Sequence, residues 1–209
     1  MEHLNTNEVE VVDGRHLRSI ATRQKLLDAG CEIFLSEGFQ KATISQIIKK
    51  AKTGYGTAYV HFTGKDDLLV VLMEDVMSEF FTIAHTPFAP KTKAEAKQII
   101  YQQVLRFLQL AESEKNMMRV FAEAIGLSAI VNAKWEEIRK QFIESITRDI
   151  TYGQKHGLIR TDVKPELAAR GWFYSNEMYQ WEIVKDIKIA SLEEIAATLT
   201  NMYTDGLYV

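Results

Sequence analysis

Apolar residues recur at helical spacing through most of the chain. Between residues 18 and 37 they fall on one side of a predicted helix, at Leu26, Leu27, Ile33 and Phe34. Gly38 follows at a place where a helix C-terminus favours a residue with positive φ, and Phe39 would supply the apolar contact that accompanies such an end. The pattern therefore predicts a first helix that stops near Gly38.

Two short helices are predicted next. Thr43 to Gln46 has the form of a capping box, in which the threonine hydroxyl caps the helix and the glutamine side chain reaches back. The residues that follow place Ile44, Ile47 and Ile48 on one side. Gly54 is an acceptable N-cap and begins a second short helix, from Tyr55 to about Phe62.

Longer helices are predicted from Lys65 toward Pro87, and then at 91–113, 115–127, 132–156, 165–185 and 191–206. We find no convincing strand, internal repeat or low-complexity tract. The fold class is therefore all-α, with about nine helices. Residues 1–17 are expected to be a disordered or frayed tail, because the first thirteen are polar and acidic.

Composition and charge narrow the choice of function. The chain is 46% hydrophobic and 25% charged, an ordinary globular mix, and no apolar run is long enough to span a membrane. Its single cysteine, Cys31, excludes an intramolecular disulfide and favours the cytoplasm. Net charge is −3, yet residues 14–65 hold nine Lys/Arg against three acids, a local charge of +6. This asymmetry suits binding to a polyanion, although a solvated basic face would look the same.

Two short helices joined by a tight turn, with a third helix before them, form a helix-turn-helix unit. The second short helix of such a unit enters the major groove of DNA with its N-terminus first. It therefore needs small or polar residues at its start, which Gly54, Gly56 and Thr57 supply. Tyr55 and Tyr59 would then project toward bases or phosphates.

Residues of about 22–69 resemble the DNA-binding domain of the TetR family of bacterial regulators. The resemblance rests on Ile33-Phe34, Gly38-Phe39, Thr43-Ile44, the run from Gly56 to Phe62, and Lys65 with Leu68. It implies that Thr57, Tyr59, His61 and Lys65 contact the DNA backbone and that Ser45 and Tyr55 lie near base edges. With the neighbouring polar and small residues, the predicted DNA-binding set is Thr43, Ser45, Lys52, Gly54, Tyr55, Gly56, Thr57, Tyr59, His61 and Lys65.

One place departs from the family pattern. The family usually has Gly-Val-Ser before the recognition helix, whereas this chain has Lys52-Thr53-Gly54. Lysine lacks the backbone freedom of glycine, so the turn is expected to be strained or closed differently.

The resemblance further implies a DNA-binding domain at 18–65 and an effector-binding and dimerisation domain at 66–209. Aromatic and methionine side chains suit an adaptable apolar pocket, although such stripes are more often core. The candidate pocket residues are Met73, Met77, Phe80, Met118, Phe121, Trp135 and Trp172, with Glu123, Glu177 and His85 as polar groups. The expected dimer interface lies on the last two helices, at Ala169, Phe173, Asn176, Ile195, Leu199 and Met202.

The sequence therefore predicts a homodimeric repressor that binds a palindromic double-stranded DNA operator and is released by a small apolar or amphipathic effector. No catalytic motif is found, and the five histidines lack metal-ligand spacing, so we expect no enzyme activity, cofactor or metal. Two alternatives stay open. One is an activator or architectural regulator without an effector, and the other is a helical ligand-binding scaffold that has lost DNA binding.

Overall fold

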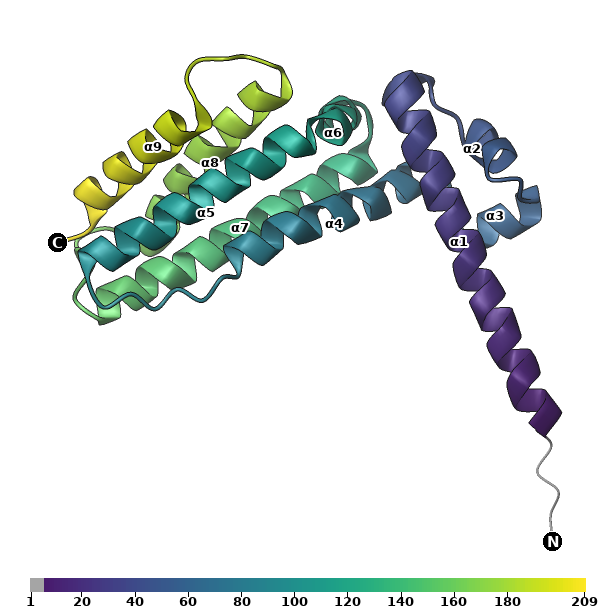
Figure 1. Cartoon of the computed structure of the whole chain (residues 1–209), viewed down its shortest axis with the longest axis horizontal. Helices are drawn as coiled ribbons and strands as arrows, with labels where there is room; N and C mark the ends of the chain where they lie inside the picture. The colour runs from purple at the N-terminus through teal and green to yellow at the C-terminus, as the bar shows by residue number, and fades with distance from the viewer. Residues whose placement is uncertain (1–5) are drawn as a thin grey trace, which may run out of the picture. The chain divides into compact units, whose positions relative to one another are not determined.

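The computed structural model describes the backbone of residues 6–209 and the side chains of residues 14–209. This part of the chain is all-α (Figure 1). Its helices are α1 (Thr6–Lys41), α2 (Ile44–Lys50), α3 (Tyr55–His61), α4 (Lys65–Ala84), α5 (Lys93–Ser113), α6 (Lys115–Leu127), α7 (Ala129–Lys155), α8 (Pro165–Val184) and α9 (Leu192–Leu207). Within residues 6–209 the only β pairing is an isolated bridge between Ile159 and Tyr208.

The chain divides into two compact units. The N-terminal unit extends to Leu72, and the C-terminal unit is Met73–Val209, so the boundary falls inside α4. None of the described helices is both long and apolar enough to cross a membrane.

The first helix of the N-terminal unit ends as its sequence predicts. Gly38 has a φ of 76° and interrupts the helical backbone near the end of α1. Phe39 then turns into the core and stacks on Phe34 with ring centroids 6.0 Å apart. Gly30 permits close packing of α1 on α4, because a Cβ atom there would lie 2.4 Å from a Leu68 methyl group.

The N-terminal tail behaves differently from the sequence expectation where the structure describes it. Residues 1–5 lie outside the described part, but residues 6–17 continue α1 toward the N-terminus. Each residue added to an existing helix closes one more hydrogen bond, and no proline interrupts this stretch. A polar composition alone was therefore insufficient to predict a tail at 6–17.

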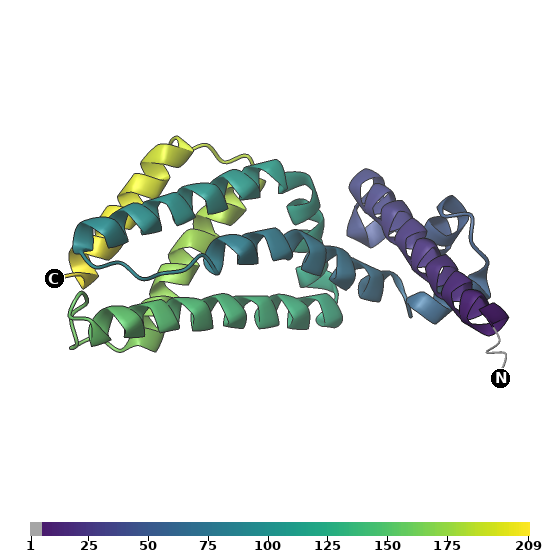
Figure 2. The same cartoon turned by 60° about the horizontal axis from the view of Figure 1, so that its bottom comes forward.

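The C-terminal unit is a bundle in which α5 packs on α8 and α9, and α7 packs on α6 and α8 (Figure 2). The last part of α4 runs beside α7, where the Phe81 and Phe142 rings stack 4.3 Å apart. The predicted helix at 115–127 matches α6, and the others agree within a few residues at each end. The bundle core includes Ile100, Leu108, Ile150, Ala196 and Leu199.

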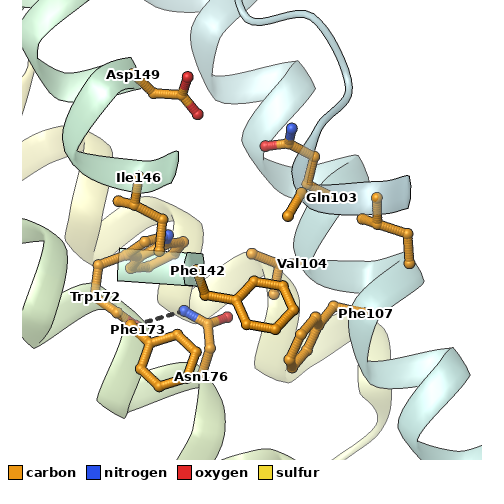
Figure 3. Close-up of a pocket in the computed structure, with 11 residues that line it drawn as sticks. Gln103, Val104, Phe107, Phe142, Ile146, Asp149, Trp172, Phe173 and Asn176 are labelled. Carbon is orange, nitrogen blue, oxygen red and sulfur yellow. Dashed lines mark hydrogen bonds between the residues drawn. The ribbon is translucent and has the colours of Figure 1, made fainter. Parts of the chain in front are cut away.

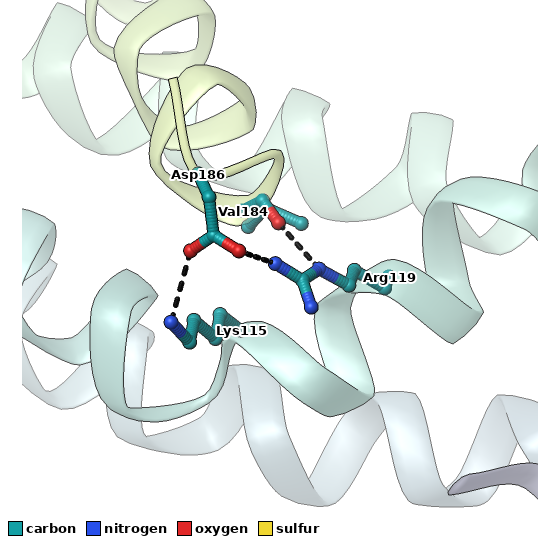
Figure 4. A network of polar contacts seen from close by, with 4 residues as sticks. All are labelled: Lys115, Arg119, Val184 and Asp186. Carbon is teal, nitrogen blue, oxygen red and sulfur yellow. Dashed lines mark hydrogen bonds and ion pairs between the residues drawn. The ribbon is translucent and has the colours of Figure 1, made fainter. Parts of the chain in front are cut away.

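A polar network ties the end of α8 to α6 (Figure 4). Asp186 follows α8 with a φ of 56° and accepts a hydrogen bond from Lys115 Nζ at 2.9 Å. Arg119 forms an ion pair with the same carboxylate and donates from Nε to the Val184 carbonyl oxygen at 2.7 Å. The hydrogen bonds from Lys115 and Arg119 lower the pKa of Asp186.

Candidate nucleic-acid interface and C-terminal cavity

The N-terminus of α2 is held by the capping box that the sequence predicts. Thr43 Oγ1 accepts a hydrogen bond from the Gln46 backbone N–H at 3.2 Å, and the Thr43 N–H donates to Gln46 Oε1 at 2.7 Å. Ile47 and Ile48 are buried against the rest of the N-terminal unit. The cap and this apolar anchor fix where α2 begins and which side it turns outward.

The turn after α2 is closed despite its departure from the family pattern. Lys52 takes the left-handed conformation, with a φ of 53°. Hydrogen bonds run from the Thr53 N–H to the Ile48 carbonyl at 3.3 Å and from the Lys52 N–H to the Lys49 carbonyl at 3.2 Å. The backbone thus adopts a glycine-like geometry with a lysine, at a cost of about 1–2 kcal/mol.

Helix α3 has one buried and one exposed side. Ala58 and Phe62 are buried, and the Arg23 guanidinium lies over the Phe62 ring, 5.2 Å from its centroid. In contrast, Tyr55 and Tyr59 keep 57% and 49% of their surface exposed. The anchored side fixes the helix, and its outer side presents two rigid amphipathic rings to a partner.

The start of α3 is open to close approach. Gly54 and Gly56 are exposed, and a Cβ atom placed on Gly56 would meet nothing within 4 Å. The protein itself therefore does not require glycine at residue 56. A partner that comes close to the backbone would require it.

Most of the predicted DNA-binding residues lie exposed on or beside α2 and α3. Eight are exposed, namely Thr43, Ser45, Lys52, Gly54, Tyr55, Gly56, Thr57 and Tyr59, whereas His61 and Lys65 are partly buried. The structure thus gathers the predicted set at one helix-turn-helix unit. Their contacts with DNA stay a prediction.

Lys65 has a structural use that the sequence did not reveal. Its Nζ donates to the carbonyl oxygens of Phe39, Ala42 and Gln40, at 2.7, 2.9 and 3.3 Å. The ammonium also lies over the Phe39 ring, 4.3 Å from its centroid. Its three donors are therefore engaged by the last residues of α1 and by Ala42 just after it, so Lys65 holds the start of α4 to the end of α1.

Residues 26–72 match the family model described as bacterial regulatory proteins of the tetR family. This stretch of the chain is a TetR-family DNA-binding domain. The matched stretch covers the end of α1, the helix-turn-helix and the beginning of α4. The family resemblance found in the sequence is thereby confirmed, and the protein is a DNA-binding transcriptional regulator.

Two curated TetR-like relatives extend the similarity beyond this domain. One is the fatty acid metabolism regulator protein of Bacillus subtilis (strain 168), 26% identical over 145 residues, which are 69% of this chain and 74% of that protein. The other is the HTH-type transcriptional repressor DhaR of Mycobacterium sp. (strain GP1), 24% identical over 151 residues, 70% of this chain and 74% of the relative.

The fold of the whole chain is also that of known TetR-family structures. SmeT in complex with triclosan aligns with a TM-score of 0.73 at 18% identity and covers 90% of this chain and 92% of its own. A second structure of SmeT describes it as the repressor of a multidrug efflux pump of Stenotrophomonas maltophilia. The predicted architecture of an N-terminal helix-turn-helix and a helical C-terminal domain is confirmed.

A cavity lies inside the C-terminal unit of the chain (Figure 3). It has a volume of about 80 Å³ between α4, α5, α7 and α8 and is partly open. Its lining is Ile83, Ala84, Gln103, Val104, Phe107, Phe142, Ile146, Asp149, Trp172, Phe173 and Asn176. Of the pocket residues predicted from the sequence, Trp172 alone is in this lining.

The other predicted pocket residues lie elsewhere. Six are core side chains with at most 1% of their surface exposed, namely Met73, Met77, Phe80, Met118, Phe121 and Trp135. Glu177 is buried and paired, since it accepts hydrogen bonds from Trp135 Nε1 at 3.0 Å and Arg139 Nε at 2.8 Å. Glu123 is partly buried on α6, and the His85 ring stacks on Phe81. Neither residue lines the cavity.

The residues predicted for the dimer interface lie in three different environments. Phe173 and Asn176 face the cavity, whereas Ala169, Ile195 and Leu199 are buried within the bundle. Met202 is 71% exposed. It borders a groove between α8 and α9 together with Trp172, Leu199 and Tyr203.

Most of the residues that line the cavity were not predicted from the sequence. Phe142, Ile146 and Asp149 recur along one side of α7, and Trp172, Phe173 and Asn176 do so on α8. The one available signal was an aspartate on a largely apolar helix side, at Asp149. Among the residues whose side chains are described, no three His, Cys, Asp or Glu side chains gather as a metal site would require.

Proposed function

We propose that this regulator is a homodimeric repressor that binds a palindromic double-stranded DNA operator through α2 and α3. A small apolar or amphipathic effector in the C-terminal cavity would release it. The observation that supports this most is the two-sided α3. Ala58 and Phe62 are buried and anchor the helix, while Tyr55 and Tyr59 are exposed to solvent. A Cβ atom on Gly56 would meet nothing within 4 Å.

Charge supports the same function. The basic residues of α1 with described side chains, including Arg15, Arg18, Arg23 and Lys25, are exposed. Lys49 and Lys52 are exposed beside the turn. Phosphate contacts by such residues supply much of the affinity of DNA-binding proteins and make it salt-dependent.

The homodimer is proposed because of the geometry of operator binding. Two half-sites about 34–36 Å apart require two helix-turn-helix units at a fixed spacing. The groove between α8 and α9 is the candidate interface, because Met202 in its lining is 71% exposed, and α8 also carries the exposed apolar residues Leu167 (65%) and Met178 (50%).

An effector is supported by the cavity and by the relatives. The cavity is apolar and aromatic, with a few polar groups, as small-molecule sites usually are. DhaR is named a repressor, and SmeT has been solved with triclosan bound. An effector that binds one conformation better than another shifts the population of the DNA-binding state.

The decisive experiment measures binding of the full chain to its own upstream DNA by fluorescence anisotropy at several salt concentrations. Gly56→Ala and Tyr59→Ala are expected to weaken binding by about tenfold or more, because a close base contact is worth about 1–3 kcal/mol. Their melting temperatures should stay within a few degrees of the parent. Gly126→Ala is the matched control, since a Cβ there also meets nothing within 4 Å and the residue lies on α6.

Two results would contradict the proposal. Salt-independent or absent DNA binding by the parent chain would favour a helical scaffold, although the closed turn at Lys52 argues for an intact helix-turn-helix. Normal affinity in both α3 variants would remove α3 from the interface. Operator binding that no small molecule weakens would favour an activator or an architectural regulator without an effector.

A further inference from the structure

The C-terminal cavity has one charged residue in its lining. Ten of its eleven lining residues are uncharged, and the exception is Asp149 of α7. Figure 3 shows the carboxylate at one end of the cavity, near Gln103 of α5, with the aromatic rings further in. The one lining side chain that can carry a charge is therefore an acid.

The Asp149 carboxylate has no partner in the part of the chain that the structure describes. It is half-buried, and none of the hydrogen bonds or ion pairs among residues 14–209 includes it. The groups that act on it electrostatically are Arg148 on its own helix, Tyr203 of α9, and Tyr208, which follows α9. Burial raises the pKa of the Asp149 carboxyl to about 7, against the opposing effect of Arg148. An unpaired acid inside a cavity carries a desolvation cost that a bound cation would relieve.

The walls of the cavity suit a cation as well. Phe142 stacks on Phe173 at 5.8 Å and meets Phe107 edge-to-face at 6.1 Å. Together with Trp172 these rings surround the space below Asp149. The faces of aromatic rings attract ammonium groups, most strongly where water is excluded.

The polar amide on the far wall adds an acceptor. Asn176 Nδ2 donates one of its two N–H groups to the Trp172 carbonyl oxygen at 2.8 Å, and Oδ1 can accept a hydrogen bond from a ligand. Carboxylate, amide oxygen and ring faces all favour positive charge. A carboxylate ligand would meet repulsion from Asp149 at the same place.

We propose that the effector is a cationic amphiphile, an amine or quaternary ammonium with an alkyl or aromatic body, whose cation lies beside Asp149 among the aromatic rings. This inference rests on the proposed function, because it names the chemical class that the effector site accepts. The cavity volume of about 80 Å³ suits an ammonium head group. The rest of the ligand would require the rings to move apart.

The test uses three probes with the same ten-carbon body: decyltrimethylammonium, decanoate and 1-decanol, each below its micelle concentration. Calorimetry on the full-length parent should give an affinity for the ammonium probe about tenfold or more above that for decanol. The affinity for decanoate should be lower than that for decanol. Asp149→Asn should remove this preference and leave decanol binding unchanged or stronger. Glu144→Gln is the matched control, because Glu144 is an exposed acid on the same helix.

Operator release, measured in parallel, separates the two proposals. Equal or tighter binding of decanoate or decanol to the parent, or binding of none of the three probes, would overturn the cationic class. An ammonium preference that survives Asp149→Asn would overturn the role of Asp149. If the parent bound no operator, the regulatory function would fail, while the calorimetric preference would still decide the ligand class.

Discussion

Tyr55 and Tyr59 of α3 are about half exposed to solvent, whereas Phe142 and Trp172 of the C-terminal unit line an internal cavity. The two regions therefore present aromatic side chains in opposite ways. On α3 a short, continuous segment carries the whole candidate surface, and buried neighbours only fix its position. In the cavity, four helices each contribute two or three residues. A surface that meets a large rigid partner can be built locally, while an enclosed site requires distant segments to converge.

The largest effect expected from this comparison separates the anchored side of α3 from its exposed side. Phe62→Ala removes a ring that is 3% exposed, and should destabilise the N-terminal unit by about 3–5 kcal/mol. Tyr59→Ala should change stability by less than about 0.5 kcal/mol. Hydrogen exchange is the measurement: protection of α2 and α3 amides should collapse in Phe62→Ala alone, with α5 amides as the internal reference. Equal loss of amide protection in Phe62→Ala and Tyr59→Ala would mean that the buried and exposed sides of α3 contribute equally to stability.

The next prediction concerns pH and the cavity. The pKa of Asp149 is about 7 in the folded protein, against an ordinary value of 3.8, so the folded state binds more protons between these values. Stability should therefore fall as pH rises from about 4 to 7. Asp149→Asn avoids this cost and should be more stable than the parent at pH 8, by on the order of 2 kcal/mol after allowance for partial exposure. The difference should shrink toward zero near pH 4.

Chemical denaturation of parent and variant at pH 4.5 and pH 8 measures this difference. The groups around Asp149 that also carry charge or titrate are Arg148, Tyr203 and Tyr208, and burial raises the pKa of both tyrosines further above this range. Glu144→Gln should show no such pH-dependent gain. A gain from Asp149→Asn of the same size at both pH values would contradict the assigned cause.

A smaller effect is expected at Lys65. Lys65→Met keeps the aliphatic length but loses the hydrogen bonds to the carbonyls of Phe39, Gln40 and Ala42. The N-terminal unit should lose about 1–2 kcal/mol, because those acceptors would be left without a charged donor. The salt dependence of operator binding should keep its slope. If the slope of log affinity against log salt became shallower by about one, Lys65 would instead contact a DNA phosphate, as the family resemblance implies.

The smallest effect is expected at the turn. Lys52→Gly should stabilise the N-terminal unit by about 1 kcal/mol, because glycine takes a φ of 53° without the strain that lysine carries there. Lys49→Gly is the control within α2 and should destabilise by about 1 kcal/mol. Thermal melting distinguishes the two. If operator affinity falls in Lys52→Gly while stability rises, the lysine side chain itself contacts DNA.

The sequence predicted more of the DNA-binding region than of the cavity, for a physical reason. Capping at Thr43, the positive φ at Gly38 and the bounds of α6 depend on residues close together in the chain. Helical periodicity shows which side of a helix faces inward, but it does not show where neighbouring helices leave a space. Hence Phe121 and Trp135 looked as suitable for a pocket as Trp172, yet both are core. Glu177 looked available because its partners Trp135 and Arg139 lie on another helix.

The solitary acid of the cavity has an evolutionary consequence. A single base change converts an aspartate codon to an asparagine codon. At residue 149 that change would leave the cavity lining without a charge while every residue of α2 and α3 stayed the same. On the ligand class proposed above, a lineage could exchange one inducer for another in one mutational step and keep its set of target genes.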